Sequence, residues 1–408
     1  MKKFFWVFFL VFALVGANVF ANGGAEEGTE SGGMSITLWT QEGEAEGAYA
    51  FVQSIADAYA SKYPGLTIEV LNKDTEALRE DFQTASLAGA APDLLWTVND
   101  HAGPFVVAEL IQPVDDLVDL SKYVPSVSMK GKTWAVPISS GNHFMLIYNK
   151  KLVANPPKST DDLIKMSSAL KSKGIIPLVF NQTEPFWLVP WLGGFGGKVF
   201  ADDGITPSLN TKAMVDTLQF LYDLKYKYEI LPAESDYDGS DTLFKEGKAA
   251  MIINGDWSLS GYKEALGDKL GVARIPMVSA TGKWPAPYTS GKYFMIPAEV
   301  SGQKLEAVVD FIKFATNYEN QIAMVKTLTR LPALKEALND PIIKSDAILS
   351  ASADQMTVGT PMPSVVEMRA NWDAMKPEMN AVLADQKTPA EAAKAMQEAA
   401  LAGVEALK

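Results

Sequence analysis

Hydrophobic and polar residues follow two different periods along the first half of this chain. Residues 35–39, SITLW, alternate as in a strand, and residues 48–65 repeat apolar side chains at helical spacing before Pro64 ends the pattern. The same two patterns recur through LTIEV (66–70), TEALREDFQTASLAG (75–89) and PDLLW (92–96). Strands and helices that alternate in this way are typical of an α/β fold with a mainly parallel sheet.

A second run with the same alternation begins after FMLIYNK (144–150). Its predicted elements are STDDLIKMSSALKSKG (159–174), IPLVF (176–180), AMVDTLQFLYDLKYKY (213–228), AAMIIN (249–254), GKYFMIPAEV (291–300) and KLEAVVDFIKFATN (304–317). The C-terminal part is predicted to be helical, and TPAE (388–391) predicts a helix capped by Thr388 with Glu391 completing a capping box. A chain of 408 residues has room for two such domains.

The N-terminus has the three parts of a secretory signal. Lys2 and Lys3 precede an apolar stretch (4–15), and Val19-Phe20-Ala21 forms a small-residue cleavage site. Residues 1–21 are therefore predicted to be a signal peptide, with an uncleaved membrane anchor as the alternative, and residues 22–34 a flexible leader. The chain has no cysteine, so neither a disulfide nor a lipid-bearing cysteine can form. We expect a soluble periplasmic protein with no direct membrane insertion after cleavage.

Charge and motifs argue against several classes of function. Asp and Glu outnumber Lys and Arg by 49 to 36, a net charge of −13, which disfavours nucleic acid and anionic membrane surfaces as partners. His101 and His143 are the two histidines, so a His/Cys metal site is not expected. The chain has no G-x-S-x-G, Walker, G-x-G-x-x-G or H-E-x-x-H motif, and we expect no cofactor and no enzymatic activity.

Aromatic residues gather where predicted strands end or helices begin. They are Trp39, Trp96, the segment EPFWLVPW (184–191), Tyr237, Trp257, the segment WPAPY (284–288) and Trp372. In open α/β sheets the carboxyl ends of the strands line the ligand crevice. A ring there offers a flat apolar face beside hydrogen-bonding groups such as Asp100, Glu184 and Asn254, which matches a pyranose sugar. For any single tryptophan, packing in the core is an equally good interpretation.

Several segments resemble a known family. They are PDLLWTVNDHAG (92–103), AVPISSGNHFMLIYNKKLVANPPKSTDDL (135–163), FNQTEPFW (180–187), SDYDGSDTLFKEGKAAMIINGDWSLS (235–260) and PMPSVVEMRANW (361–372). In this order they resemble the extracellular solute-binding proteins of sugar ABC transporters, and their pattern is closest to the maltose/maltodextrin-binding proteins. The resemblance runs from about Ile36 to the C-terminus.

This resemblance implies a two-lobed periplasmic-binding-protein fold of type II, with a sugar held between the lobes and a hinge that closes around it. The N-terminal lobe is expected to comprise residues 35–142 and 292–338, and the C-terminal lobe residues 143–291 and 339–408. The implied partners are a neutral mono- or oligosaccharide and the membrane permease of an ABC importer. The protein itself is expected to be a monomer.

The resemblance also implies the ligand-binding residues, position by position. They are Gln41, Glu42, Asp100, Asn142, Glu184, Phe186, Trp187, Tyr237, Trp257 and Trp372. The chain departs from the family pattern where Thr97 stands in place of a cleft tryptophan, with Trp96 one position earlier, and where His101 replaces a basic residue. Gly141-Asn142 replaces a hinge glutamate. These departures keep the sugar class but leave open whether maltose is the ligand and which of Trp96 and Thr97 faces the cleft.

Two other functions stay open from the residues. A secreted glycoside-acting enzyme needs two carboxylates near the cleft, and EGEAEG (42–47) offers such a pair. A receptor of the same fold for a polyamine or a peptide needs strong cleft acidity without matched aromatic rings. The set of aromatic residues at strand ends favours the sugar receptor over both.

Overall fold

The computed structural model describes residues 33–44 and 46–407. The expected signal peptide (1–21) lies outside the described residues, and so does the expected leader (22–34) as far as residue 32. The first strand begins at Met34, one residue before the expected start of the fold. Within the described part of the chain, no helix combines the length and the apolar character needed to cross a membrane.

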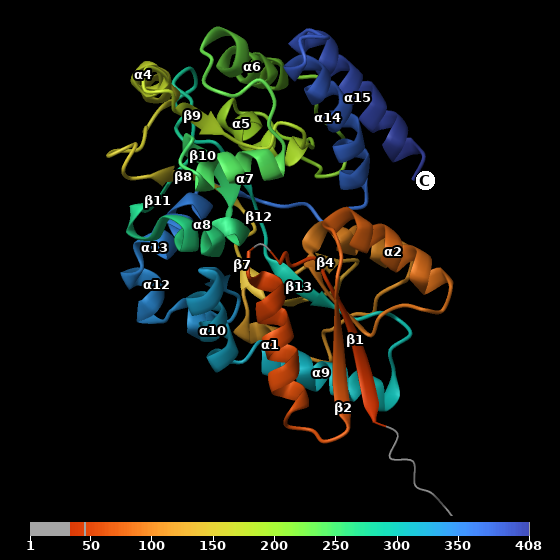
Figure 1. Ribbon diagram of the computed structural model, residues 1–408. Helices are drawn as coiled ribbons and strands as arrows, with labels where there is room; N and C mark the ends of the chain where they lie inside the picture. The colour runs from red at the N-terminus through yellow and green to blue at the C-terminus, as the bar shows by residue number, and fades with distance from the viewer. Residues whose placement is uncertain (1–32, 45, 408) are drawn as a thin grey trace, which may run out of the picture.

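The lower half of the molecule in Figure 1 is built on a five-stranded sheet of order β2-β1-β3-β13-β6. Its strands are β1 (Met34–Thr40), β2 (Leu66–Asn72), β3 (Leu94–Val98), β6 (Val136–Pro137) and β13 (Lys292–Met295). The main helices are α1 (Ala48–Ala60), α2 (Thr75–Leu87), α3 (Ala102–Val107), α9 (Gly302–Ala315) and α10 (Tyr318–Leu328). Trp96 packs with residues of α1 and α9, whereas Leu95 packs with residues of α2 and α3. Successive side chains point to opposite faces, so β3 is buried on both.

The upper half is built on a four-stranded sheet of order β11-β8-β10-β9. Its strands are β8 (Phe144–Asn149), β9 (Ile176–Val179), β10 (Ala249–Gly255) and β11 (Leu270–Ala273). Its helices are α4 (Thr160–Lys171), α5 (Val189–Gly194), α6 (Lys212–Tyr222), α7 (Tyr237–Lys245), α8 (Leu259–Leu266), α13 (Ala347–Met356), α14 (Glu367–Leu383) and α15 (Pro389–Glu405). Thr388 caps α15 and forms the expected capping box with Glu391.

Both sheets are mixed, and this corrects the expectation of mostly parallel sheets. In the first sheet β1 runs parallel to β2 and β3, but β13 runs antiparallel to both of its neighbours. In the second sheet β10 is parallel to β9, and β8 is antiparallel to β10 and β11. β8 and β13 each follow a segment that crosses between the halves. Each strand therefore starts at the edge of its sheet that faces the opposite half, which is why it runs antiparallel to its neighbours.

Short paired segments lie close to the places where the chain passes from one half to the other. β7 (Ser139–Ser140) pairs with β14 (Leu331–Pro332), and β12 (Tyr288–Thr289) pairs with β15 (Thr360–Pro361). A bridge between Gly141 and Ser290 ties two of the crossing segments together. The remaining short elements are β4 (Ser128–Met129), β5 (Lys132–Thr133), α11 (Lys335–Leu338) and α12 (Pro341–Ser345).

We name the halves lobe one and lobe two, with the residue ranges expected from the sequence: 35–142 plus 292–338, and 143–291 plus 339–408. Each lobe has its own sheet and its own hydrophobic core. The exact boundaries stay a prediction.

Candidate ligand-binding cleft

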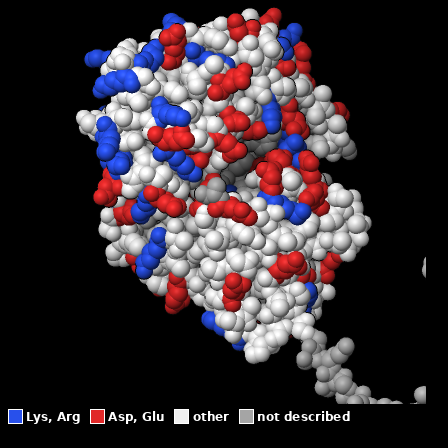
Figure 2. Space-filling view, in the orientation of Figure 1, with Lys and Arg blue, Asp and Glu red and all other residues white. Residues whose placement is uncertain are grey.

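Short turns carry several of the expected site residues to the edges of the sheets. The 3-10 turn η1 (Asn99–His101) follows β3 of lobe one, and η5 (Asp256–Ser258) follows β10 of lobe two. A third turn, η3 (Pro185–Trp187), comes after β9. Strand ends of this kind form ligand crevices in α/β proteins. The face in Figure 2 is hollowed between the two lobes, and acidic side chains border the hollow.

Lobe two supplies a cluster of aromatic rings. The rings of Phe186 and Trp257 are nearly parallel, with centroids 6.4 Å apart and an angle of 27° between their planes. Trp372, from α14, meets Phe186 edge-on at 6.0 Å. One face of Trp257 lies against Gly255, where an added Cβ would come within 2.1 Å of the indole ring. Trp257 and Phe186 stay partly exposed, so part of their apolar surface is open to the cleft.

Trp187 and Tyr237 belong to the same cluster but differ in access. Trp187 is buried, and its indole N–H donates to the carbonyl of Ile253 at 2.9 Å, which is a structural contact within lobe two. The Trp257 indole N–H donates to the Tyr237 hydroxyl at 3.1 Å, and that hydroxyl donates to Glu46 Oε1 at 2.6 Å. Tyr237 therefore joins lobe two to lobe one.

Glu42 lies in a buried ion pair at the end of β1. Nη1 of Arg330 is 2.8 Å from both of its carboxylate oxygens, and the Trp96 indole N–H donates to Oε1 at 2.9 Å. Burial disfavours the charged carboxylate, but the charges of Arg330 and Lys292 outweigh this and hold the pKa of Glu42 below its usual value. Arg330 also donates to the carbonyl of Trp257 in lobe two at 3.4 Å.

The structure settles how Trp96 and Thr97 point. Trp96 is buried in the core of lobe one against Phe294, whereas Thr97 donates to Oε1 of Gln41 at 3.3 Å on the side of the β1–α1 loop. Thr97 also hydrogen-bonds Nδ1 of His101 at 2.7 Å. Burial lowers the pKa of His101 to about 3, so this imidazole is neutral and does not replace the charge of a basic residue.

Asp100 faces lobe two. Its carboxylate lies near the Trp372 side chain, which brings an acid of lobe one close to a ring of lobe two. Burial and the nearby charge of Glu76 raise the pKa of Asp100 to about 6.

Two more cross-lobe contacts flank these residues. Arg369 of α14 forms an ion pair with Glu76 of α2, and the hydroxyl of Ser260 donates to the carbonyl of Glu46 at 2.7 Å. Together with the contact between Tyr237 and Glu46, they bring the lobes against each other in a closed arrangement.

The remaining two expected residues sit at the margins. Glu184 is half-exposed and pairs with Lys376 of α14 at 2.5 Å. Asn142 is buried in a crossing segment with φ of 45°, and its backbone N–H donates to Asp256 at 3.1 Å. The structure thus places Asn142 at the hinge, and it brings Gln41, Asp100, Phe186, Tyr237, Trp257 and Trp372 to the facing sides of the two lobes.

Sequence reasoning missed four charged residues of the cleft: Glu46, Glu76, Lys292 and Arg330. Glu46 stands in the acidic EGEAEG segment, but its position there does not show that it reaches Tyr237, 191 residues away. Lys292 and Arg330 are buried cations. A buried Glu42 needs a positively charged partner, and this need predicts a cation in the cleft. The sequence does not show that Glu42 is buried, so the prediction was out of reach.

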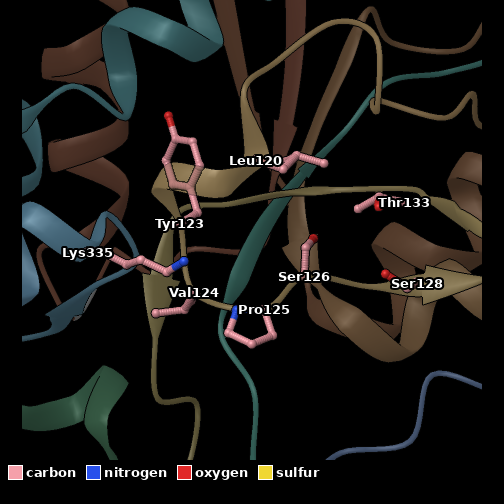
Figure 3. A pocket seen from close by; sticks show the side chains of 8 residues that line it. All are labelled: Leu120, Tyr123, Val124, Pro125, Ser126, Ser128, Thr133 and Lys335. Atoms are coloured by element: carbon pink, nitrogen blue, oxygen red, sulfur yellow. The ribbon is translucent and has the colours of Figure 1, made fainter.

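Another hollow lies on lobe one, lined by Leu120, Tyr123, Val124, Pro125, Ser126, Ser128, Thr133 and Lys335 (Figure 3). Its one aromatic residue, Tyr123, is buried with its hydroxyl bonded to Thr316, and no carboxylate lines the hollow. It lacks the rings and acids that the cleft combines. No group of three or more His, Cys, Asp or Glu side chains among the described residues is arranged to hold a metal ion.

Comparisons with known proteins agree with this architecture. Residues 54–351 match the family model of bacterial extracellular solute-binding proteins. The maltotriose-binding protein of Pyrococcus abyssi is 28% identical over 355 residues, which cover 82% of this chain and 75% of that protein. The maltodextrin-binding protein MdxE of Bacillus subtilis is 27% identical over 79% of each chain.

Among solved structures, the maltose/maltodextrin-binding domain MalE from Bdellovibrio bacteriovorus, bound to maltotriose, superposes with a TM-score of 0.87. It is 35% identical and covers 91% of this chain and 100% of that domain. The two-lobed fold expected from the sequence is confirmed. With a family match over most of its length, this chain belongs to the bacterial extracellular solute-binding proteins.

Proposed function

We propose that this protein is the sugar-binding receptor of an ABC importer and that it holds a short maltodextrin, such as maltotriose, between its lobes. The proposal is carried by one observation: rings of lobe two face acids of lobe one across the cleft, in a chain 35% identical to a domain bound to maltotriose. Rings stack on the C–H faces of a glucose unit, and carboxylates accept hydrogen bonds from its hydroxyl groups.

The division of the site between the lobes explains how binding is coupled to delivery. Neither the rings nor the acids alone surround a sugar, so the full set of contacts exists only when the lobes are closed. A ligand that binds the closed form better shifts the population toward it. The closed, loaded protein is then the form for a membrane permease to recognise.

The ligand contacts are proposed in three groups. Phe186, Trp257 and Trp372 provide stacking surface, and Asp100 and Glu184 accept from hydroxyl groups. Gln41 and Tyr237 adjoin the same space. Glu42, Asn142 and Trp187 act through other residues, because their polar groups or their rings are engaged within the protein.

Calorimetry with maltotriose tests the proposal directly, with cellotriose as a control of the same length and a different linkage. We expect maltotriose to bind, and at a hundredfold excess over its Kd to raise stability by about 2.7 kcal/mol. The sugar should remain intact on chromatography. Absence of binding to maltotriose, maltose and longer maltodextrins refutes the proposal. Release of reducing ends that the Glu184→Gln variant lacks supports the glycoside-acting enzyme.

We also propose that the protein is exported to the periplasm, cleaved near Ala21 and left without a lipid. The absence of cysteine supports this, because a lipoprotein needs a cysteine for its anchor. The intact mass of the exported protein should correspond to a chain that starts near Asn22. A membrane-bound product that retains residues 1–21 contradicts the proposal.

A further inference from the structure

Lys292 is a buried lysine at the edge of the sheet of lobe one, and the direction of its strand puts it there. It is the first residue of β13, which runs antiparallel to β3 and pairs Lys292 with Val98. Because β3 ends where β13 begins, the lysine lies at the edge of the sheet from which Asp100 also extends. Its backbone N–H donates to Ser139 Oγ at 3.0 Å, and its side chain is part of a residue that is only 8% exposed.

The ammonium group lies among the acids of the cleft. Its charge acts on the carboxylates of Glu42, Glu46 and Asp100, and on Asp256. It stands 5.9 Å from the centroid of the Trp257 ring. Burial and the charge of Arg330 lower the pKa of Lys292 despite these acids.

Among the described residues, the Lys292 ammonium has neither a hydrogen-bond acceptor nor an ion-pair partner within bonding distance. The hydrogen bonds to the Glu42 carboxylate come from Arg330 and Trp96 rather than from Lys292. An ammonium has three N–H donors, and each can bond an acceptor that enters the cleft. Lys304 of the same lobe behaves in the ordinary way, with Asp93 at 3.1 Å. Among the described residues, therefore, the donors of Lys292 have no acceptor, and a ligand in the cleft can supply one.

The position of the group suits a sugar on the Trp257 ring. A pyranose stacked at van der Waals distance, about 3.5–4.0 Å, lies closer to the indole than the ammonium does. An oxygen at the edge of that sugar, displaced to the side of the ring centre, then comes within hydrogen-bonding reach of the ammonium. The carboxylates of the cleft only accept hydrogen bonds, whereas each sugar hydroxyl both donates and accepts. A donor is needed to satisfy the hydroxyl and ring oxygens.

We propose that Lys292 is a specificity-determining residue of the cleft, which donates hydrogen bonds to oxygens of the sugar unit stacked on Trp257. This inference rests on the proposed function.

The test compares Lys292→Met with wild type, using calorimetry with maltotriose and with its monodeoxy analogues. Lys304→Met is the matched control, and Lys292→Arg keeps the charge. We expect Lys292→Met to weaken maltotriose binding about 10- to 100-fold, since a charge-assisted hydrogen bond is lost. Lys304→Met should change Kd less than about twofold, and Lys292→Arg should retain part of the affinity.

A structural lysine and a ligand contact differ in one further readout. At least one monodeoxy analogue should bind wild type more weakly than maltotriose binds wild type. On Lys292→Met, the same analogue and maltotriose should bind with equal affinity. Urea denaturation should show that the unliganded Lys292→Met protein is folded under the conditions of the calorimetry, with any loss of stability arising from the favourable charge that Glu42 no longer has nearby.

Three outcomes overturn the inference. One is a Lys292→Met variant that binds maltotriose as wild type does, and another is an equal loss for every deoxy analogue in both proteins. A third is a variant that loses stability but, once folded, binds normally. If Lys292→Met does not fold, Lys292→Gln takes its place in the same comparisons. If wild type binds maltotriose and these results appear, only this inference fails; if wild type does not bind, the proposed function fails with it.

Discussion

Removing Arg330 is expected to destabilise the unliganded protein strongly. Both Arg330 and Glu42 have side chains that are 2% exposed, and Nη1 lies 2.8 Å from each carboxylate oxygen. In Arg330→Met, the Trp96 N–H is the one donor to the Glu42 carboxylate that remains among the described residues. Breaking a buried ion pair from one side leaves an uncompensated charge, which typically costs about 3–5 kcal/mol. We expect a loss of this size in the free energy of unfolding.

Urea denaturation without sugar measures this loss, and Arg274→Met is the control. Arg274 holds Asp354 at 2.6 Å, but that pair is partly exposed, and such pairs contribute about 0–1 kcal/mol. Adding Glu42→Gln to Arg330→Met should recover part of the loss, because the stranded charge is gone. A loss in Arg330→Met no larger than in the control, or additive losses in the double variant, refutes the reasoning.

The pH dependence gives an independent check on the same variant. In wild type the pKa of Glu42 is lowered, so its contribution is present above the pKa of the unfolded chain and is lost as the pH falls through the folded value. Without Arg330, burial dominates and raises the folded pKa, so protonation stabilises the variant as the pH falls. The difference between wild type and Arg330→Met should therefore shrink on acidification. A difference that stays constant contradicts this account.

Two further predictions concern the cleft. Trp257 packs on Gly255 and Phe144 but stays partly exposed, so Trp257→Ala should lower the unliganded free energy of unfolding by about 1–3 kcal/mol. Calorimetry should show maltotriose binding weakened about 5- to 150-fold. Normal binding by the folded variant contradicts a stacking role. The pKa of Asp100 is raised to about 6 in the folded protein, so its contribution to stability is fully present below the unfolded pKa of about 4 and is lost as pH rises to about 6. Denaturation across this range should show a slope that Asp100→Asn reduces; an equal slope in both proteins contradicts it.

Much of the fold follows from local patterns that the chain carries in its own order. The alternation of β1 and the helical spacing of α1 predict their elements, because period and turn residues act over a few neighbours. The capping box of α15 is local in the same sense, since Thr388 and Glu391 are three residues apart. The placement of Trp257 just after a buried strand likewise predicts a position at a sheet edge, and the structure has the ring there, partly exposed.

Neighbouring aromatic residues show where this reasoning stops. Phe186 and Trp187 are adjacent in EPFW, and the resemblance implies that both contact the ligand. In the structure Trp187 turns inward to bond the carbonyl of Ile253, while Phe186 stacks beside Trp257. Which of two adjacent rings is buried depends on what packs against the turn, and the turn's own sequence does not specify that.

The charged part of the cleft and the direction of the strands depend on long-range packing. Glu42 and Arg330 meet although 288 residues separate them, and Lys292 reaches the acids because β13 runs antiparallel to β3. Local periodicity fixes whether a segment is a strand or a helix, but a strand has the same pattern in either direction. The direction of a strand and the partner of a buried charge depend on how the chain crosses between the lobes. These crossings bring together residues that are far apart in the sequence, and local patterns do not show which residues will meet.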